Sequence, residues 1–128
     1  MTLAKSRENL QSQIMKFDEV SEFLIPEGCH IIELSNSGSD PDVSIARARV
    51  EPGVTTEVHW LEDTWERYVV LEGRGEVELD GGSWEIVDQS DVVLIPPGCR
   101  QRIRNIGAND LIFLAICSPR FTPDCYRS

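Results

Sequence analysis

The sequence predicts an all-β domain whose short strands form a sandwich or a barrel. From about residue 43 onward, apolar runs of strand length alternate with turn signals made of Gly, Pro, Asn and Asp. The chain has 128 residues, enough for one domain with its own core. We expect an N-terminal extension over residues 1–42, a barrel over 43–118 and a C-terminal tail over 119–128.

The expected strands follow one another closely. Three strands are predicted over residues 43–50, 55–61 and 66–71. The turn Asp80-Gly81-Gly82 tolerates positive φ and predicts a hairpin between strands 75–79 and 83–87. A buried strand over 92–95 stops at Pro96-Pro97, and strands 100–105 and 111–117 are expected to form a second hairpin across 107–110.

The first 42 residues give weaker signals. Residues 6–16 are a candidate helix because Leu10 and Ile14 are spaced i,i+4, and so short a helix has to dock on the barrel or on a second subunit. Residues 17–24 are ambiguous, 29–34 predict a strand, and the polar stretch 35–42 predicts a loop near the barrel mouth.

The charge balance excludes one class of partner. The net charge is −10, whereas nucleic-acid binding needs clustered Lys and Arg. Arg100, Arg102 and Arg104 alternate with Gln101 and Ile103, so the arginines are expected on an outer face or at a subunit contact.

Location is predicted from what the chain lacks. No apolar run approaches the ~20 residues of a membrane helix, and no secretory signal opens the sequence. The four cysteines form no Cys-x-x-Cys pair, which favours reduced thiols and a cytoplasmic protein.

Two blocks carry the residues of chemical interest. The first places Gly53, His59, Leu61, Glu66 and Gly73 in order. The second comprises Ser90, Pro96, Gly98, Gln101 and Asn105. Together they resemble the two motifs of single-domain cupins of the cupin 2 conserved-barrel type, with Leu61 and Gln101 at histidine positions and Ser90 at a glycine position. The resemblance implies a double-stranded β-helix, the jelly-roll barrel.

The resemblance also implies a metal site. Residues 59 and 61 share a strand face, and in metal-binding cupins the side chains matching 59, 61, 66 and 101 converge on one ion. His59, Glu66 and Gln101 are therefore candidate ligands for iron, manganese, nickel, copper or zinc. One imidazole, one carboxylate and one amide bind such an ion more weakly than the full set. Glu57, expected on the same face as His59, could supply another oxygen.

The same positions predict a pocket without a metal. In that interpretation His59 and Glu66 pair with each other, and Gln101 joins their network. The predicted ligand-binding residues are Glu57, His59, Leu61, Glu66, Tyr68, Gln101 and Ile103.

Two functions follow from these alternatives. The first is a small-molecule-binding cupin that holds its metal weakly or lacks one. The alternative is an enzyme of dioxygenase, isomerase, lyase or decarboxylase type. It would use a metal on His59, Glu66 and Gln101, or His59 or Glu66 as a base with Tyr68 as the acid. Trp60 has outward parity, and with the resemblance to small cupins it predicts a homodimer.

Overall fold

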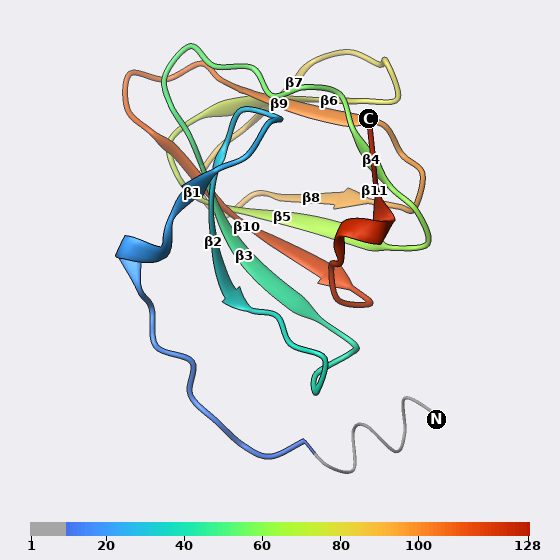
Figure 1. Ribbon diagram of the computed structural model, residues 1–128. Helices are drawn as coiled ribbons and strands as arrows, with labels where there is room; N and C mark the ends of the chain where they lie inside the picture. Colours follow the sequence, from blue (N-terminus) through green and yellow to red (C-terminus); the bar gives the residue numbers. More distant parts are fainter. Residues whose placement is uncertain (1–9) are drawn as a thin grey trace.

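The computed structural model describes residues 10–128 and is built almost entirely of strands (Figure 1). The strands are β1 Phe23–Leu24, β2 His30–Ser35, β3 Ser44–Val50, β4 Trp60–Leu61, β5 Trp65–Glu72, β6 Gly75–Leu79, β7 Glu85–Val87, β8 Val92–Ile95, β9 Gln101–Asn105, β10 Leu111–Ser118 and β11 Tyr126–Arg127. Two short 3-10 turns, η1 Glu19–Ser21 and η2 Pro123–Cys125, complete the described elements.

The strands form three sheets that enclose one core. The largest has the order β1-β2-β3-β10-β5-β8, a second has the order β7-β6-β9, and β11 pairs with β4. In Figure 1 the sheet of β6, β7 and β9 lies above the large sheet, and β4 and β11 lie at one end between them. Two facing antiparallel sheets are the jelly-roll arrangement, so the predicted all-β barrel is confirmed.

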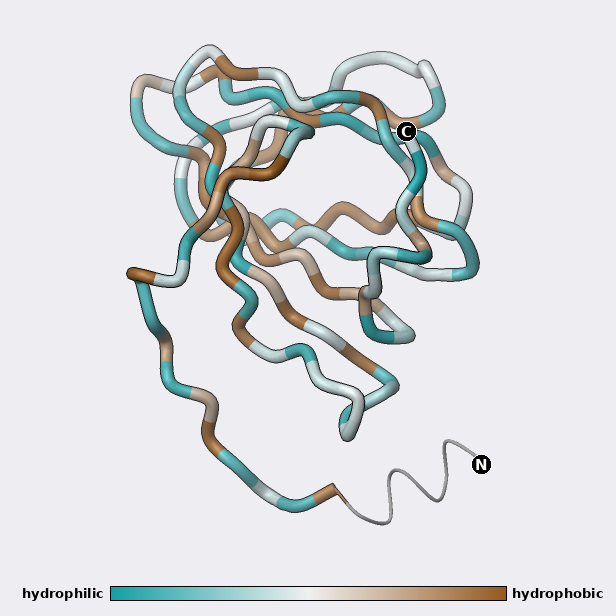
Figure 2. Tube along the Cα trace, viewed as in Figure 1, coloured by the Kyte–Doolittle hydropathy of each residue, from teal (hydrophilic) through white to brown (hydrophobic). Residues whose placement is uncertain are grey.

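Alternation along the strands builds the core. Val50, Val70, Ile95, Ile103 and Leu111 come from five different strands, and none is more than 1% exposed. Hydrophobic segments run along the strands in Figure 2, while the connecting loops are largely hydrophilic. Because successive strand residues point to opposite faces, one face of each sheet supplies this core.

The predicted N-terminal helix does not form where the structure describes it. Residues 6–9 lie outside the described residues, and 10–18 contain no helical turn. Ile14 is 83% exposed, and Phe17 is 58% exposed with the Arg47 guanidinium over its ring, so these side chains bury little apolar surface. A helix this short needs such packing. The following residues enter the large sheet as β1 and β2, which pair with each other and then with β3.

The predicted strand over residues 55–61 is interrupted. Thr56 donates its amide to Ile103, and His59 donates to Gln101, so a three-residue step opposes a two-residue step on β9. Such an extra residue is a bulge, and it changes which face the following side chains occupy. Only Trp60–Leu61 remains as a regular strand.

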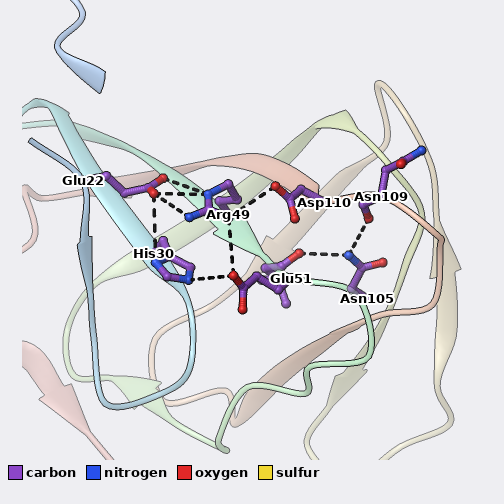
Figure 3. Close-up of polar contacts among 8 residues, drawn as sticks. Glu22, His30, Arg49, Glu51, Asn105, Asn109 and Asp110 are labelled. Carbon is purple, nitrogen blue, oxygen red and sulfur yellow. Dashed lines mark hydrogen bonds and ion pairs between the residues drawn. The ribbon is translucent and has the colours of Figure 1, made fainter. Parts of the chain in front are cut away.

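The expected hairpin between residues 100–105 and 111–117 is wrong. Strand β9 pairs with β6, whereas β10 pairs with β3 and β5, so the chain crosses from one sheet to the other between them. The Asn105 side chain holds this corner by donating to the carbonyl oxygen of Asn109 (Figure 3). It also donates to the carbonyl oxygen of Val50 and accepts from the Gly107 amide. The hairpin across Asp80-Gly81-Gly82 is confirmed by the pairing of β6 with β7.

A polar cluster attaches the N-terminal segment to the large sheet. Arg49 on β3 pairs with Glu22 at 2.6 Å and with Asp110 at 3.3 Å (Figure 3). His30 lies beside them, 3.7 Å from Glu51. These contacts fix the start of β1, and β1 leads directly into the loop that carries Glu27.

The arginines of the second block lie on the outer face of the β7-β6-β9 sheet, as expected. Arg102 pairs with Glu78 and Arg104 with Glu76, both at 3.0 Å, and both guanidinium groups stack on Trp84. Within residues 10–128, no helix is long and apolar enough to span a bilayer.

Candidate functional site

A cavity of about 160 Å³ opens between the large sheet and the β4–β11 pair. Most of its wall is apolar, and aromatic rings from both ends of the chain contribute to it. The aromatic and aliphatic wall includes Phe23, Ile25, Leu61, Ala115, Phe121 and Tyr126. Its polar side chains come from Glu27, Glu33, Ser44, His59 and Glu66. A cavity with few polar groups on an apolar wall is typical of small-molecule sites.

His59 is held at one ring nitrogen and left open at the other. It is 3% exposed, and its Nδ1 lies 2.9 Å from the backbone carbonyl of Glu57 and 3.1 Å from Oε2 of Glu27. The carbonyl oxygen can only accept, so Nδ1 carries the proton and Nε2 keeps its lone pair. Among residues 10–128 nothing hydrogen-bonds to Nε2, and the ring lines the cavity.

The loop between β1 and β2 places Glu27. The Ile25 amide donates to the Cys29 carbonyl, and the Gly28 amide donates back to Ile25. Gly28 has φ of +107°, a conformation that residues with a side chain rarely adopt. The Glu27 carbonyl also accepts from the Glu57 amide, which joins this loop to the segment that carries His59.

Glu66 belongs to a buried chain of hydrogen bonds. Nε2 of Gln101 donates to Oε1 of Glu66 at 2.8 Å, and the Tyr68 hydroxyl donates to Oε1 of Gln101. The Cys117 thiol lies 3.8 Å from the other Glu66 oxygen. Glu66 therefore faces the cavity, while Gln101 and Tyr68 support it from behind.

The C-terminal tail contributes one wall. The Tyr126 ring stacks on His59 with 5.4 Å between the ring centroids and 16° between their planes. Tyr126 reaches this place because β11 pairs with β4, with Tyr126 opposite Leu61. The tail thus covers the imidazole and fixes the plane of its ring.

Burial makes the acidic groups of the cavity hold their protons. It raises the pKa of Glu27 to about 8, with help from the negative charges of Glu66 and Glu57. Burial also raises the pKa of Glu66 to about 7, although hydrogen bonds from Gln101 and Cys117 oppose the rise. The pKa of His59 is lowered because burial disfavours the imidazolium, so near pH 7 the imidazole is neutral.

These donors do not fit a transition metal. Both polar atoms of the Gln101 amide are already used by Tyr68 and Glu66, and Leu61 offers no ligand atom. His59 supplies a single imidazole, and its Nδ1 is occupied. Within residues 10–128, no three His, Cys, Asp or Glu side chains are grouped to hold an ion. The cavity residues therefore do not form a site for a transition metal.

The structure separates the predicted site residues into three groups. His59, Leu61 and Glu66 line the cavity. Tyr68, Gln101 and Ile103 are buried in the core behind the cavity, and none of the three lines it. Glu57 has an exposed side chain outside the cavity, because the bulge after Thr56 reverses the expected alternation. His59 pairs with Glu27 and Glu66 with Gln101, instead of the predicted pairing of His59 with Glu66.

Sequence reasoning missed Glu27 and Tyr126. Both lie outside the two motif blocks, and each reaches the cavity through a pairing that only the fold reveals. The one local signal for Glu27 is its place in Pro26-Glu27-Gly28, a turn directly before a predicted strand. Turns usually carry charged residues outward, so this signal alone does not single out a buried carboxyl.

Comparison with known proteins gives the family. The cupin domain model matches residues 46–117. A curated relative, the uncharacterized protein MJ1618 of Methanocaldococcus jannaschii, is 32% identical over 109 residues, which cover 84% of this chain and 86% of the relative.

Two solved structures show the same fold at low identity. KdgF from Halomonas sp. superposes with a TM-score of 0.74 at 19% identity, covering 85% of this chain and 96% of the other. Pac13, described as a unique nucleoside dehydratase and found in Streptomyces, superposes with a TM-score of 0.71 at 18% identity, covering 88% of each chain. The family model and the relative, with the barrel that carries both motif blocks, show that this chain belongs to the cupin family.

Proposed function

We propose that this chain is a small-molecule-binding cupin whose ligand occupies the cavity between His59, Glu27 and Glu66. One observation carries the proposal: a buried imidazole presents an unpaired Nε2 to an apolar cavity. Nε2 is reached through the cavity, because no fully buried side-chain nitrogen or oxygen in residues 10–128 lacks a partner. A bound molecule can therefore replace solvent as its hydrogen-bond partner. A cavity of about 150 Å³ holds a benzene-sized molecule, so the enclosed part of the ligand has roughly six non-hydrogen atoms.

A thermal-shift screen of small metabolites at millimolar concentration tests the proposal. Ala115 lines the cavity, so Ala115→Leu should fill part of it and abolish the shifts. Circular dichroism checks that this variant folds, and Leu61→Phe offers a second way to fill the same space. Hits that survive in both folded variants, or no hits at all, would contradict binding in the cavity.

A second candidate function is acid–base catalysis without a metal. The favouring observation is that Glu27 and the Glu57 carbonyl hold Nδ1, which orients the imidazole and leaves Nε2 as a base. Glu66, with its pKa raised to about 7, is suited to exchange a proton with the same ligand. Tyr68 would act through Gln101 as a positioning residue, since its hydroxyl donates to that amide.

Proton exchange into solvent distinguishes catalysis from binding. Each screening hit is incubated with the protein in deuterium oxide, and loss of carbon-bound proton signals is followed by NMR. Loss that disappears in His59→Gln and Glu66→Gln, while these variants still bind the hit, supports the enzyme. If the carbon-bound proton signals of every hit persist in the presence of the unaltered protein, the chain binds the hits without catalysing proton exchange.

We further propose a homodimer in the cytoplasm. Ile86 on β7 and Val92 and Leu94 on β8 are each more than half exposed, and a second copy could cover them. Trp60 presents less free surface to a second copy than sequence alternation predicts, because the Arg100 guanidinium lies over its half-buried ring. All four cysteines are free thiols, which supports a reducing compartment. A monomer in sedimentation velocity would refute the dimer.

A further inference from the structure

Most polar groups that face the cavity can accept hydrogen bonds, and the hydroxyls of Ser44 and Tyr126 can also donate. Glu27 and Glu66 present carboxyl oxygens, His59 presents the lone pair of Nε2, and Glu33 lies at the rim. No Lys or Arg in residues 10–128 lines this cavity. An anionic ligand would therefore meet two acidic groups and no cation inside an apolar wall, which is an unfavourable environment for it.

The balance of hydrogen-bond donors and acceptors in the cavity limits the chemical class of ligand that it can bind. With Nδ1 protonated, Nε2 can only accept a hydrogen bond. Glu66 and Glu27, with pKa values of about 7 and about 8, ionise towards pH 8, and a nearby cation favours their ionised, accept-only form. A primary ammonium has three N–H donors and no acceptor, so it complements these groups. Phe23, Phe121 and Tyr126 supply aromatic rings in the same wall, and aromatic rings beside a cation add further attraction.

We propose that the cavity binds a small primary amine, with its ammonium directed at Nε2 of His59 and the carboxylates of Glu27 and Glu66. This inference rests on the proposed binding function and adds the chemical class of the ligand. The apolar body of the amine lies against Leu61 and Ala115, which line the same cavity. Its size follows the cavity, so about six non-hydrogen atoms are enclosed.

The charged groups around the rim place no cation in the cavity wall described by residues 10–128. Burial raises the pKa of Glu33, and a hydrogen bond from Asn36 and the charge of Arg120 oppose the rise. Arg120 donates to the side chain of Asn36 and does not line the cavity. The Cys117 and Cys29 thiols stay neutral, because burial and nearby carboxylates raise their pKa values.

Small molecules of similar size that differ in charge provide the test. Isobutylamine, isobutanol and isobutyrate are titrated into the full chain by calorimetry at pH 8 in 0.15 M salt, and benzylamine, benzyl alcohol and benzoate form a second set. Charge-assisted hydrogen bonds contribute more than neutral ones, so we expect the amine of a set to bind at least about tenfold more tightly than its two isosteres.

Matched variants separate the cavity from the general negative charge of the chain. Glu27→Gln and Glu66→Gln keep the shape of the side chain and remove its charge, and each should weaken amine binding about tenfold. Glu72→Gln is the control, because Glu72 lies on the same strand as Glu66 with an exposed side chain. Since the net charge is −10, amine binding that is equal in all variants would reveal non-specific attraction and overturn the inference.

The isosteres also separate failure of the inference from failure of the proposed function. If the alcohol or the acid binds as tightly as the amine and Ala115→Leu abolishes that binding, the cavity binds ligands but does not select amines. If neither set binds to the unaltered chain at millimolar concentration while screening hits still bind and are lost in Ala115→Leu, only the amine inference is overturned. If the screen also gives no hits, both proposals are overturned.

Discussion

Nδ1 of His59 lies 3.1 Å from the carboxyl group of Glu27, although the two residues are 32 positions apart in the sequence. The contact joins the loop before β2 to the segment before β4, and both residues face the same cavity. Because Nδ1 also meets the Glu57 carbonyl, the geometry fixes which nitrogen carries the proton. The chemistry of the cavity depends on this tautomer.

The first prediction concerns that tautomer. We expect His59 to be neutral at pH 7, because burial lowers its pKa, and to carry its proton on Nδ1, because the Glu57 carbonyl oxygen facing that nitrogen can only accept. Long-range proton–nitrogen NMR spectra distinguish the two ring nitrogens. His30 is the other histidine of the chain, so His30→Gln assigns the signals. An imidazolium at pH 7, or a proton on Nε2, would contradict the arrangement.

The second prediction concerns stability and pH. Glu27 and Glu66 have folded-state pKa values of about 8 and about 7, above the ordinary 4.5. Between about pH 4.5 and pH 8 the folded chain therefore holds more protons than the unfolded chain, so the free energy of unfolding falls as the pH rises through this range. The lowered pKa of His59 acts in the opposite direction, but only below about pH 6.5.

Urea unfolding at several pH values measures this effect. Between pH 6.5 and 8.5 we expect the free energy of unfolding to fall by about 3 kcal/mol, because proton loss from the two carboxyls adds up to roughly two pH units at about 1.4 kcal/mol each. Glu27→Gln should remove much of the slope because an amide does not titrate. Glu72→Gln should keep it. A stability that is constant over this range would mean that neither carboxyl is protonated in the folded chain.

The barrel could be predicted from sequence because its signals are local. The turn Asp80-Gly81-Gly82 lies between strands that pair as predicted, and Leu61 and Glu66 lie in the cavity where the motif spacing put them. The predicted alternation of inward and outward side chains is wrong after Thr56, where the strand contains one extra residue. Such a bulge changes the face on which the following side chains lie without changing the composition. Glu57 was therefore placed on the wrong face.

The rest of the site depends on contacts between distant segments. Glu27 and Tyr126 enter the cavity through pairings of β1 with β2 and of β11 with β4, each formed by only two residues per strand. Pairs this short leave almost no periodic signal. The prediction of a second hairpin was wrong for a related reason. Residues 107–110 have the composition of a turn, but they connect two sheets, and local composition does not distinguish such a connection from a hairpin.

The third prediction concerns Ser90, which replaces the glycine of the second motif. Its φ is +73°, a region that costs about 1 kcal/mol for a residue with a side chain. We expect Ser90→Gly to raise the free energy of unfolding by about 1 kcal/mol in urea titrations. Ser83→Gly is the matched control, since Ser83 does not have positive φ and should gain nothing. Equal effects of the two substitutions would show that the turn is unstrained.

The fourth prediction concerns metal. After incubation with iron, manganese, nickel, copper or zinc and removal of free ions, elemental analysis of the natural chain should find far less than stoichiometric metal. The reason is the donor set: Gln101 is engaged by Tyr68 and Glu66, and Leu61 cannot bind an ion. Leu61→His adds a second imidazole to the cavity wall that already contains His59 and Glu66, so this variant should gain metal.

A matched pair of substitutions decides whether any bound metal sits in the cavity. His59→Ala in the Leu61→His background should remove the gained metal, because one imidazole and one carboxylate hold such ions weakly. His30→Ala should leave it unchanged, since His30 lies in the polar cluster with Glu22 and Glu51. Stoichiometric metal in the natural chain that is lost in His59→Ala would instead mean that Gln101 gives up its hydrogen bonds to an ion. In that case the amine would have to share the cavity with a cation, and its preference over the neutral isostere should disappear.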